Sequence, residues 1–98
     1  MFVHNVLFWL KKDLTKAERA AFVKGIKMLA ALPSVRNSFI GKPAKTDRPI
    51  IDRTYSYGLT VVFDDLAGHD AYQIHPDHLK FIEKNKAKWA KVKIYDFE

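Results

Sequence analysis

The sequence predicts an α+β fold of the ferredoxin-like type, a four-stranded antiparallel sheet with its helices on one face. Two observations predict it. Four segments alternate apolar and polar residues and two repeat apolar residues at helical spacing, in the order β-α-β-β-α-β. The second helical segment is interrupted by Pro76. With 98 residues, the chain is expected to form a single domain over residues 1–98.

The first strand is expected over residues 1–11. Successive side chains of a strand point to opposite faces, so one face carries His4, Val6, Phe8 and Leu10. The other face is also largely apolar, with Val3, Leu7 and Trp9. A strand with two apolar faces must be buried on both sides, and so short a chain has too few residues to cover the second face. A second copy of the chain could cover it, so this strand is a first argument for a homodimer.

The first helix is expected to begin at Thr15, because Thr15 and Glu18 have the spacing of a capping box. Its apolar residues at helical spacing are Phe22, Ile26 and Leu29. Pro33 closes the pattern after Leu32. Gly25 lies inside this helix and predicts close packing against another element.

The middle of the chain predicts two strands joined by a loop. Strands are expected over residues 34–40 and 54–63, the second with alternating aromatic and aliphatic residues. Residues 44–53 are rich in basic side chains and predict a mobile loop at the mouth of whatever the sheet encloses. This loop is interpreted as a solvated connection, with recognition of a carboxylate or phosphate as the alternative.

The last third of the chain predicts a broken helix and a final strand. Asp64 or Asp65 can cap a helix over residues 66–74, and Pro76 can begin the next helix. The apolar contacts of that second helix are expected from Leu79, Phe81, Ile82 and Trp89. A strand over residues 91–97 completes the sheet.

The stretch from Asp70 to His78 holds the candidate site. On an unbroken helix, Tyr72 and His78 would lie about 240° apart, on different faces. A bend at Pro76 can turn both side chains towards one cavity. A structural role for His78, with its ring bonded to a neighbour in the first helical turn, stays open, and so does a role of His75 in closing the break.

The sheet face that carries no helix is expected to bind a second copy of the chain. It would display an apolar patch made of Leu7, Trp9, Val62, Tyr95 and Phe97. Packing two such sheets face to face would hide the patch and produce a barrel-like homodimer through the open sheet face.

Composition narrows the classes of function. No apolar run is long enough to span a membrane, and the first ten residues make a poor signal peptide. The absence of cysteine is consistent with a cytoplasmic protein. The net charge of +6 comes with no nucleic-acid-binding motif, so no nucleic acid partner is expected. No cofactor motif is present, and His75 and His78 lack the further ligands a metal site needs.

Five pieces of the sequence together resemble the stress-responsive α/β-barrel (Dabb) domain family. They are His4 in the first strand, Thr54-Tyr55-Ser56-Tyr57, Phe63-Asp64-Asp65-Leu66, Tyr72-Gln73-Ile74-His75-Pro76-Asp77-His78, and Ile94-Tyr95-Asp96-Phe97. The resemblance covers nearly the whole chain and implies a dimeric ferredoxin-like α/β barrel.

One branch of this family, the plant polyketide cyclases, closes a linear polyketide by aldol condensation. The resemblance implies Tyr72 and His78 as catalytic residues. It implies as ligand-binding residues His4, Val6, Phe8, Phe22, Leu59, Ile74 and Trp89. Tyr57 at the rim of the pocket and His75 beside the proline break are added as further ligand-binding candidates. Further apolar lining is implied at Val23, Val61, Val92 and Ile94. This chain departs from the branch at Tyr57, where the branch has a histidine, and at Ile26, where it has a tyrosine, and both departures argue against the same substrate.

Three functions are therefore open. The leading one is a stress-response-type dimeric barrel that binds a small apolar or aromatic ligand between sheet and helices. The alternative is a cyclase-like enzyme without an organic cofactor, in which His78 is the general acid or base and Tyr72 anchors a carbonyl. The third is a structural dimer with no ligand. Either ligand-based function requires a pocket of roughly 300 Å³ or more near His78.

Overall fold

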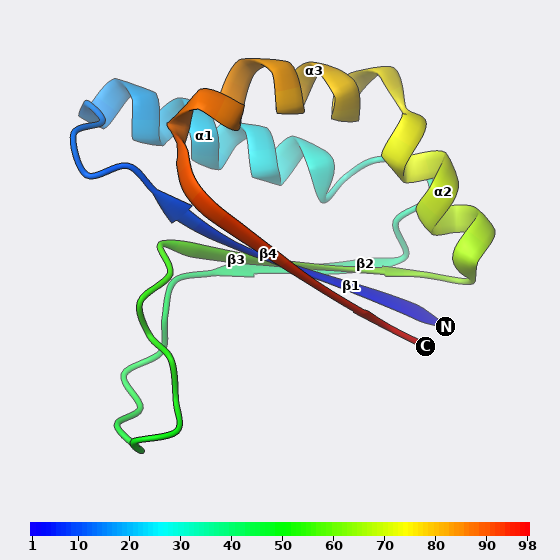
Figure 1. The fold of residues 1–98 in the computed structure, drawn as a ribbon. Coiled ribbons are helices and arrows are strands. Elements are labelled where there is room, and N and C mark those ends of the chain that lie inside the picture. Colours follow the sequence, from blue (N-terminus) through cyan, green and yellow to red (C-terminus); the bar gives the residue numbers. More distant parts are fainter.

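The computed structural model describes residues 1–98 and consists of one sheet covered on one face by helices (Figure 1). Its elements in chain order are β1 (Phe2–Leu10), α1 (Lys16–Leu29), β2 (Asn37–Gly41), β3 (Tyr57–Phe63), α2 (Leu66–Ile74), α3 (Pro76–Asn85), the short 3₁₀ helix η1 (Lys86–Lys88) and β4 (Trp89–Phe97). The strand order is β2-β3-β1-β4, and every neighbouring pair is antiparallel. The predicted ferredoxin-like fold is thereby confirmed.

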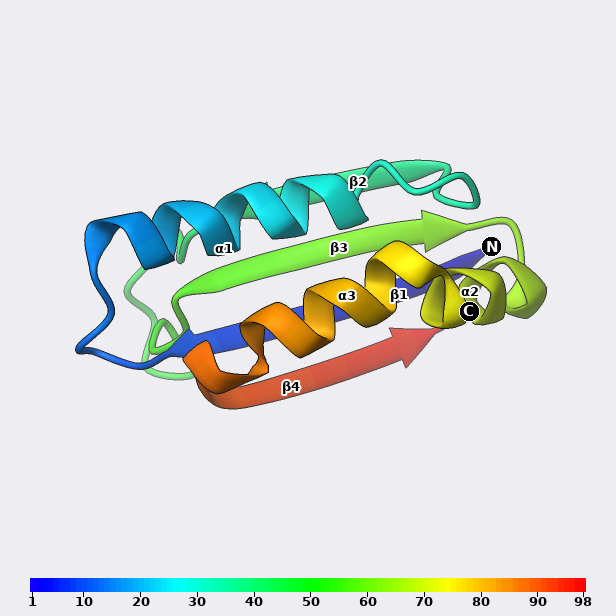
Figure 2. The ribbon, with the colours of Figure 1, turned by 90° about the horizontal axis from the view of Figure 1, so that it is seen from above.

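The helices divide the covered face of the sheet between them. Seen from above, α1 lies towards the β2 and β3 side and α3 lies towards the β1 and β4 side, while α2 closes one end (Figure 2). Because β1 pairs with both β3 and β4, it is a central strand, and His4 lies opposite Val61 on one side and Asp96 on the other. This register brings residues from three distant parts of the sequence onto one row.

The core lies between the sheet and the helices. The buried pattern of β1 alternates strictly, so the side chains that the sequence places on the helix side are inside. The core residues are Phe2, Val6, Phe8, Leu10, Phe22, Ile26, Leu29, Leu32, Leu59, Val61, Phe63, Tyr72 and Phe81. The predicted apolar face of the first helix is confirmed.

Local capping fixes where the helices begin. The Thr15 hydroxyl accepts a hydrogen bond from the Glu18 backbone, and the Glu18 carboxylate accepts one from the Thr15 backbone, as the capping box predicts. Asp65 caps α2 by accepting from the backbone N–H of Gly68. His75 separates α2 from α3 with φ −59° and ψ 136°, an extended conformation.

Several boundaries differ from the predicted ones. Residues 34–36 belong to the turn after α1, where the backbone N–H of Val35 bonds to the carbonyl of Leu32, so the second strand begins only at Asn37. The third strand begins only at Tyr57, although the N–H of Ser56 already donates to the carbonyl of Phe8 on β1.

The end of the second helical segment was also predicted wrongly. The helix ends at Asn85 and the 3₁₀ turn η1 redirects the chain, so Trp89 is the first residue of β4 and not a helical residue. Leu79 is 57% exposed and points away from the core, whereas Phe81 is buried.

The opposite face of the sheet carries no helix (Figure 1). Its exposed apolar side chains include Phe39, Tyr95 and Phe97, and the predicted patch residues Leu7, Trp9 and Val62 are only half-buried there. The loop between β2 and β3 extends on this side of the sheet, away from the helices (Figure 1), so it does not border the space under them as the sequence suggested. None of the helices is both long and apolar enough to span a lipid bilayer.

Candidate functional site

A cavity of about 120 Å³ lies between the sheet and helices α2 and α3. Thirteen residues line it, and ten of them are hydrophobic. The lining consists of His4, Val6, Phe8, Leu29, Leu59, Tyr72, Gln73, His78, Phe81, Ile82, Trp89, Val92 and Ile94. We take this cavity as the candidate site because the buried titratable side chains meet there.

A larger hollow of about 460 Å³ lies on the outer surface between α1 and α3. Lysines dominate its wall, with Lys24, Lys80, Lys84 and Lys88. It contains no histidine or tyrosine, and only three of its ten lining residues are hydrophobic. Its surroundings therefore offer charge without groups that transfer a proton near neutral pH.

Tyr72 and His78 both face the cavity. Their rings meet edge to face with centroids 4.8 Å apart, and the two residues are only 1% and 8% exposed. Tyr72 lies in the last turn region of α2 and His78 in the first turn of α3, on the two sides of Pro76. The bend at the proline thus gives the geometry that the sequence predicts for this pair.

Two buried side-chain nitrogens have no hydrogen-bond partner within the protein. They are Nδ1 of His78 and Nε1 of Trp89, and both residues line the cavity. Such orphaned groups are uncommon in folded proteins, because each costs about 1 to 3 kcal/mol of lost solvation. Two residues in the largely apolar wall of the cavity therefore each hold a nitrogen with unused hydrogen-bonding capacity.

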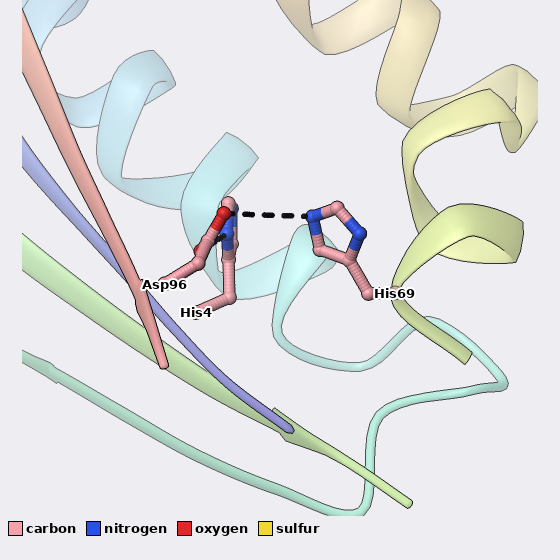
Figure 3. A group of neighbouring side chains, drawn as sticks. All are labelled: His4, His69 and Asp96. Carbon is pink, nitrogen blue, oxygen red and sulfur yellow. Dashed lines mark hydrogen bonds and ion pairs between the residues drawn. The ribbon is translucent and has the colours of Figure 1, made fainter. Parts of the chain in front are cut away.

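His4 is 2% exposed and needs a partner, as its place on the covered face of the sheet predicts. Asp96 supplies it: Nδ1 of His4 donates to Oδ1 of Asp96 at 2.5 Å. His69 approaches the same carboxylate from α2, with its Nε2 4.0 Å from Oδ2 of Asp96 (Figure 3). The sequence identified neither contact of Asp96, because the pairing with His4 depends on strand register and the contact with His69 depends on how α2 packs on the sheet.

Burial controls the protonation of the site. Desolvation lowers the pKa of His78, and neighbouring His4, His69 and His75 lower this pKa further. Desolvation also lowers the pKa of His4, outweighing the Asp96 hydrogen bond that raises it. Burial raises the pKa of the Tyr72 phenol well above its usual range. At neutral pH the site therefore presents neutral imidazoles and a protonated phenol.

The structure brings together part of the predicted site. Seven predicted residues line the cavity: His4, Val6, Phe8, Leu59, Tyr72, His78 and Trp89. Of the four residues implied as further lining, Val92 and Ile94 line the cavity as well, whereas Val23 and Val61 do not.

Four predicted ligand-binding residues do not line the cavity. Phe22 is fully buried in the core between α1 and the sheet, and Ile74 is 74% exposed on the outer side of α2. Tyr57 lies opposite the cavity-lining Phe8 in the sheet, but its ring packs against Phe22 and lies under the Lys42 ammonium group. His75 is the cap of α3, where its Nδ1 accepts from the backbone N–H of Asp77.

Other lining residues were missed by sequence reasoning. Leu29, Phe81 and Ile82 have helical spacing, which predicts burial but not which part of the interior they border. Gln73 gives no signal in the sequence, because it enters the lining only through the orientation of α2.

The cavity is smaller than the roughly 300 Å³ that the sequence-based hypothesis required. Aromatic rings fill much of the interior: Phe8 packs against Phe22, Phe81 and Trp89 with centroids 5.0 to 6.3 Å apart. An apolar cavity of about 150 Å³ accommodates benzene. The expected pocket of that size is therefore absent, and the space near His78 suits at most a compact molecule of about one ring.

A model of the stress responsive A/B barrel domain family matches residues 2–98. The chain belongs to this family. The A/B barrel domain is also 23% identical to olivetolic acid cyclase of Cannabis sativa over 95 residues, which cover 96% of this chain and 92% of the cyclase.

Solved structures share the fold of this A/B barrel domain. A dimeric ferredoxin-like protein from Thermobifida fusca superposes with a TM-score of 0.78 at 24% identity, covering 98% of this chain and 88% of that chain. Hydroxynitrile lyase from Passiflora edulis superposes with a TM-score of 0.79 at 14% identity, covering 98% and 90%. At these identities both likenesses establish the ferredoxin-like architecture.

Proposed function

We propose that this A/B barrel domain binds a compact, largely apolar molecule that carries one hydrogen-bonding oxygen. The single observation that carries the proposal is the pair of buried, unpartnered nitrogens, Nδ1 of His78 and Nε1 of Trp89, on two residues that line the cavity. A ligand that satisfies these groups removes a desolvation cost the protein already bears, so its polar contact contributes fully to affinity.

The two nitrogens determine whether the oxygen of the ligand must donate or accept a hydrogen bond. The indole N–H of Trp89 only donates, so it requires an acceptor. Neutral His78 offers either a donor or an acceptor at Nδ1, depending on its tautomer. A hydroxyl meets both demands, while the apolar lining from Val6, Leu59 and Val92 favours an aromatic or aliphatic body.

We further propose that the protein is a homodimer through the open sheet face. Phe39, Tyr95 and Phe97 are 54% to 63% exposed on the face that carries no helix. A monomer would leave these side chains in water. The similarity to a protein described as dimeric, with the same fold, supports a second copy of this chain as the cover.

Acid–base chemistry at a carbonyl compound is a second candidate function. The observation that favours it is the contact between a neutral imidazole and a protonated phenol, His78 and Tyr72, at one cavity. A phenol donating to a carbonyl oxygen stabilises the enolate that forms when an imidazole takes a proton from the neighbouring carbon. The similarity to a cyclase over nearly the full chain points to the same class of chemistry.

Calorimetry with phenol and toluene tests the binding proposal. The two molecules have nearly the same shape, and only phenol carries the oxygen. We expect phenol to bind at least about tenfold more tightly than toluene, because one hydrogen bond to an otherwise unsatisfied group contributes on the order of 1.4 kcal/mol. The His78→Leu variant should weaken phenol binding and leave toluene binding unchanged. Equal affinity for both molecules in the native protein would overturn the proposal.

Deuterium exchange tests the second candidate. Acetophenone carries hydrogens on the carbon next to its carbonyl, and a general base replaces them with deuterium in D₂O. If the protein is an acid–base catalyst, the native chain accelerates this exchange, and both His78→Leu and Tyr72→Phe slow it. A native rate equal to that of buffer would reject catalysis of this class while leaving the binding proposal intact.

A further inference from the structure

We propose that His4, His69 and Asp96 form a binding site for one divalent transition-metal ion, with zinc as the representative ion. One ligand atom from each residue can be chosen so that all three lie within 4.8 Å of one another (Figure 3). The three side chains come from β1, α2 and β4, so the fold itself assembles the cluster. The site goes beyond the proposed small-molecule function, and it uses neither of the two unpartnered nitrogens.

The donor set has the chemistry of a transition-metal site. Two imidazoles and one carboxylate suit zinc and other divalent first-row metals, and three protein ligands leave positions open for water or another molecule. Ligand atoms around tetrahedral zinc lie roughly 3.3 Å apart, because each bond is about 2.0 to 2.1 Å. Here Nδ1 of His4 lies 2.5 Å from Oδ1 of Asp96, and Nε2 of His69 lies 4.0 Å from Oδ2 of the same carboxylate, so the three side chains must shift slightly to bind one ion.

The surroundings of His69 hold its ring in the orientation that a ligand needs. Its Nδ1–H donates to Oδ1 of Asp70 at 3.1 Å, which leaves Nε2 as a lone pair. The Gln73 amide donates to this Nε2 at 3.3 Å, in agreement with the same tautomer. Metal-bound histidines commonly have such a carboxylate on the second ring nitrogen.

The position of the cluster allows an ion to enter. The side chain of Asp96 is 35% exposed on the edge strand β4, whereas that of His4 is only 3% exposed. An ion can therefore reach His4 and His69 from the side of Asp96, and solvent can fill the open positions. The ion would replace the His4–Asp96 hydrogen bond by two metal bonds, and the imidazole proton of His4 would move from Nδ1 to Nε2.

Cobalt spectroscopy and zinc calorimetry test the proposal on tag-free protein treated with a chelator and then dialysed. We expect one equivalent of Zn²⁺ per chain, and with Co²⁺ the absorption bands between about 500 and 650 nm that low-coordinate nitrogen and oxygen ligation produces. His69→Ala and Asp96→Asn should each weaken binding at least tenfold. His75→Asn, which keeps a helix-capping side chain, and Asp47→Asn in the exposed loop should bind as the native chain does.

A measurement on the native protein alone guards against variants that fold poorly. In ¹⁵N-labelled protein, Zn²⁺ should shift the ring nitrogens of His4 and His69 and leave those of His75 in place. The proposal is overturned if up to 1 mM Zn²⁺ shifts none of these signals, or if the shifts are confined to His75. Equal affinity in native, His69→Ala and Asp96→Asn proteins would overturn it as well.

Discussion

Tyr72 and His78 lie on two different helices, yet their rings meet edge to face with centroids 4.8 Å apart. Pro76 stands between them at the first position of α3, and the extended conformation of His75 turns the chain. The contact closes one wall of the cavity. The same short stretch of sequence therefore determines the path of the backbone and the chemistry of the site.

The Tyr72 ring is part of the core, whereas its hydroxyl is assigned to the site only by the proposed function. Tyr72→Ala should lower the free energy of unfolding by about 3 to 5 kcal/mol, because it leaves a cavity among Phe63, His4 and His78. Tyr72→Phe keeps the ring and should cost less than about 1.5 kcal/mol. Urea denaturation measures both values. Similar losses for the two variants would mean that the hydroxyl, and not the ring, stabilises the protein.

Gly25 marks the closest approach of α1 and α3. A Cβ atom at this position would lie 2.8 and 2.9 Å from two ring carbons of buried Phe81. Gly25→Ala should therefore destabilise the protein by about 1 to 3 kcal/mol, although alanine gains about 1 kcal/mol in helix propensity. Gly41→Ala is the matched control, because nothing lies within 4 Å of its Cβ position. A stabilised Gly25→Ala protein would show that the helices can move apart freely.

Stability should fall as the pH drops below about 6.5, the ordinary histidine pKa. Folding lowers the pKa of His78, so the unfolded chain takes up a proton at a higher pH than the folded chain does. The groups that face His78 and oppose its charge are His4, His69 and His75. The free energy of unfolding therefore keeps its full value above that pH and decreases as the solution becomes more acidic.

Urea titrations at pH 7.5 and 5.5 in the presence of a chelator measure this effect. His78→Gln should lose less stability over this interval than the native chain, while part of the loss persists because the pKa of His4 is lowered too. Identical losses in the two proteins would assign the acid sensitivity to other groups.

The dimer proposal predicts a native mass of about twice the chain mass of 11.3 kDa by light scattering at micromolar concentration. Phe97→Lys places a charge on the open face at a side chain that is 60% exposed in one chain, so it should produce a monomer without unfolding it. Circular dichroism checks that the fold is retained. A native mass near that of one chain would refute the proposed interface.

Local sequence signals predict the elements of this fold well because their causes are local. The capping box at Thr15, the period-two pattern of β1 and the break at Pro76 each depend on residues within one or two turns of one another. Boundaries after turns were less predictable. The sequence places Trp89 among the apolar contacts of the second helix, whereas the 3₁₀ turn η1 and pairing with Leu10 make it a strand residue.

The candidate site was predictable only in part. His78 and Tyr72 follow from the proline break, and the need of His4 for a partner follows from its buried face. The identity of that partner does not follow, because the opposition of His4 and Asp96 depends on how β1 and β4 align across 92 residues of sequence. The volume of the cavity likewise depends on how the rings of Phe8, Phe81 and Trp89 fill the interior.

The most direct test of ligand binding follows the two indole N–H signals of the native protein in ¹H–¹⁵N spectra during a titration with phenol. Trp89 Nε1 is unpartnered in the cavity wall, whereas Trp9 Nε1 donates to the Thr54 hydroxyl at 2.8 Å outside the cavity and provides an internal control. We predict a saturable shift of the Trp89 signal at millimolar phenol or below, with the Trp9 signal unmoved and a much smaller effect of toluene. A Trp89 signal that stays in place up to 10 mM phenol, or that moves together with the Trp9 signal, would contradict the proposed binding site.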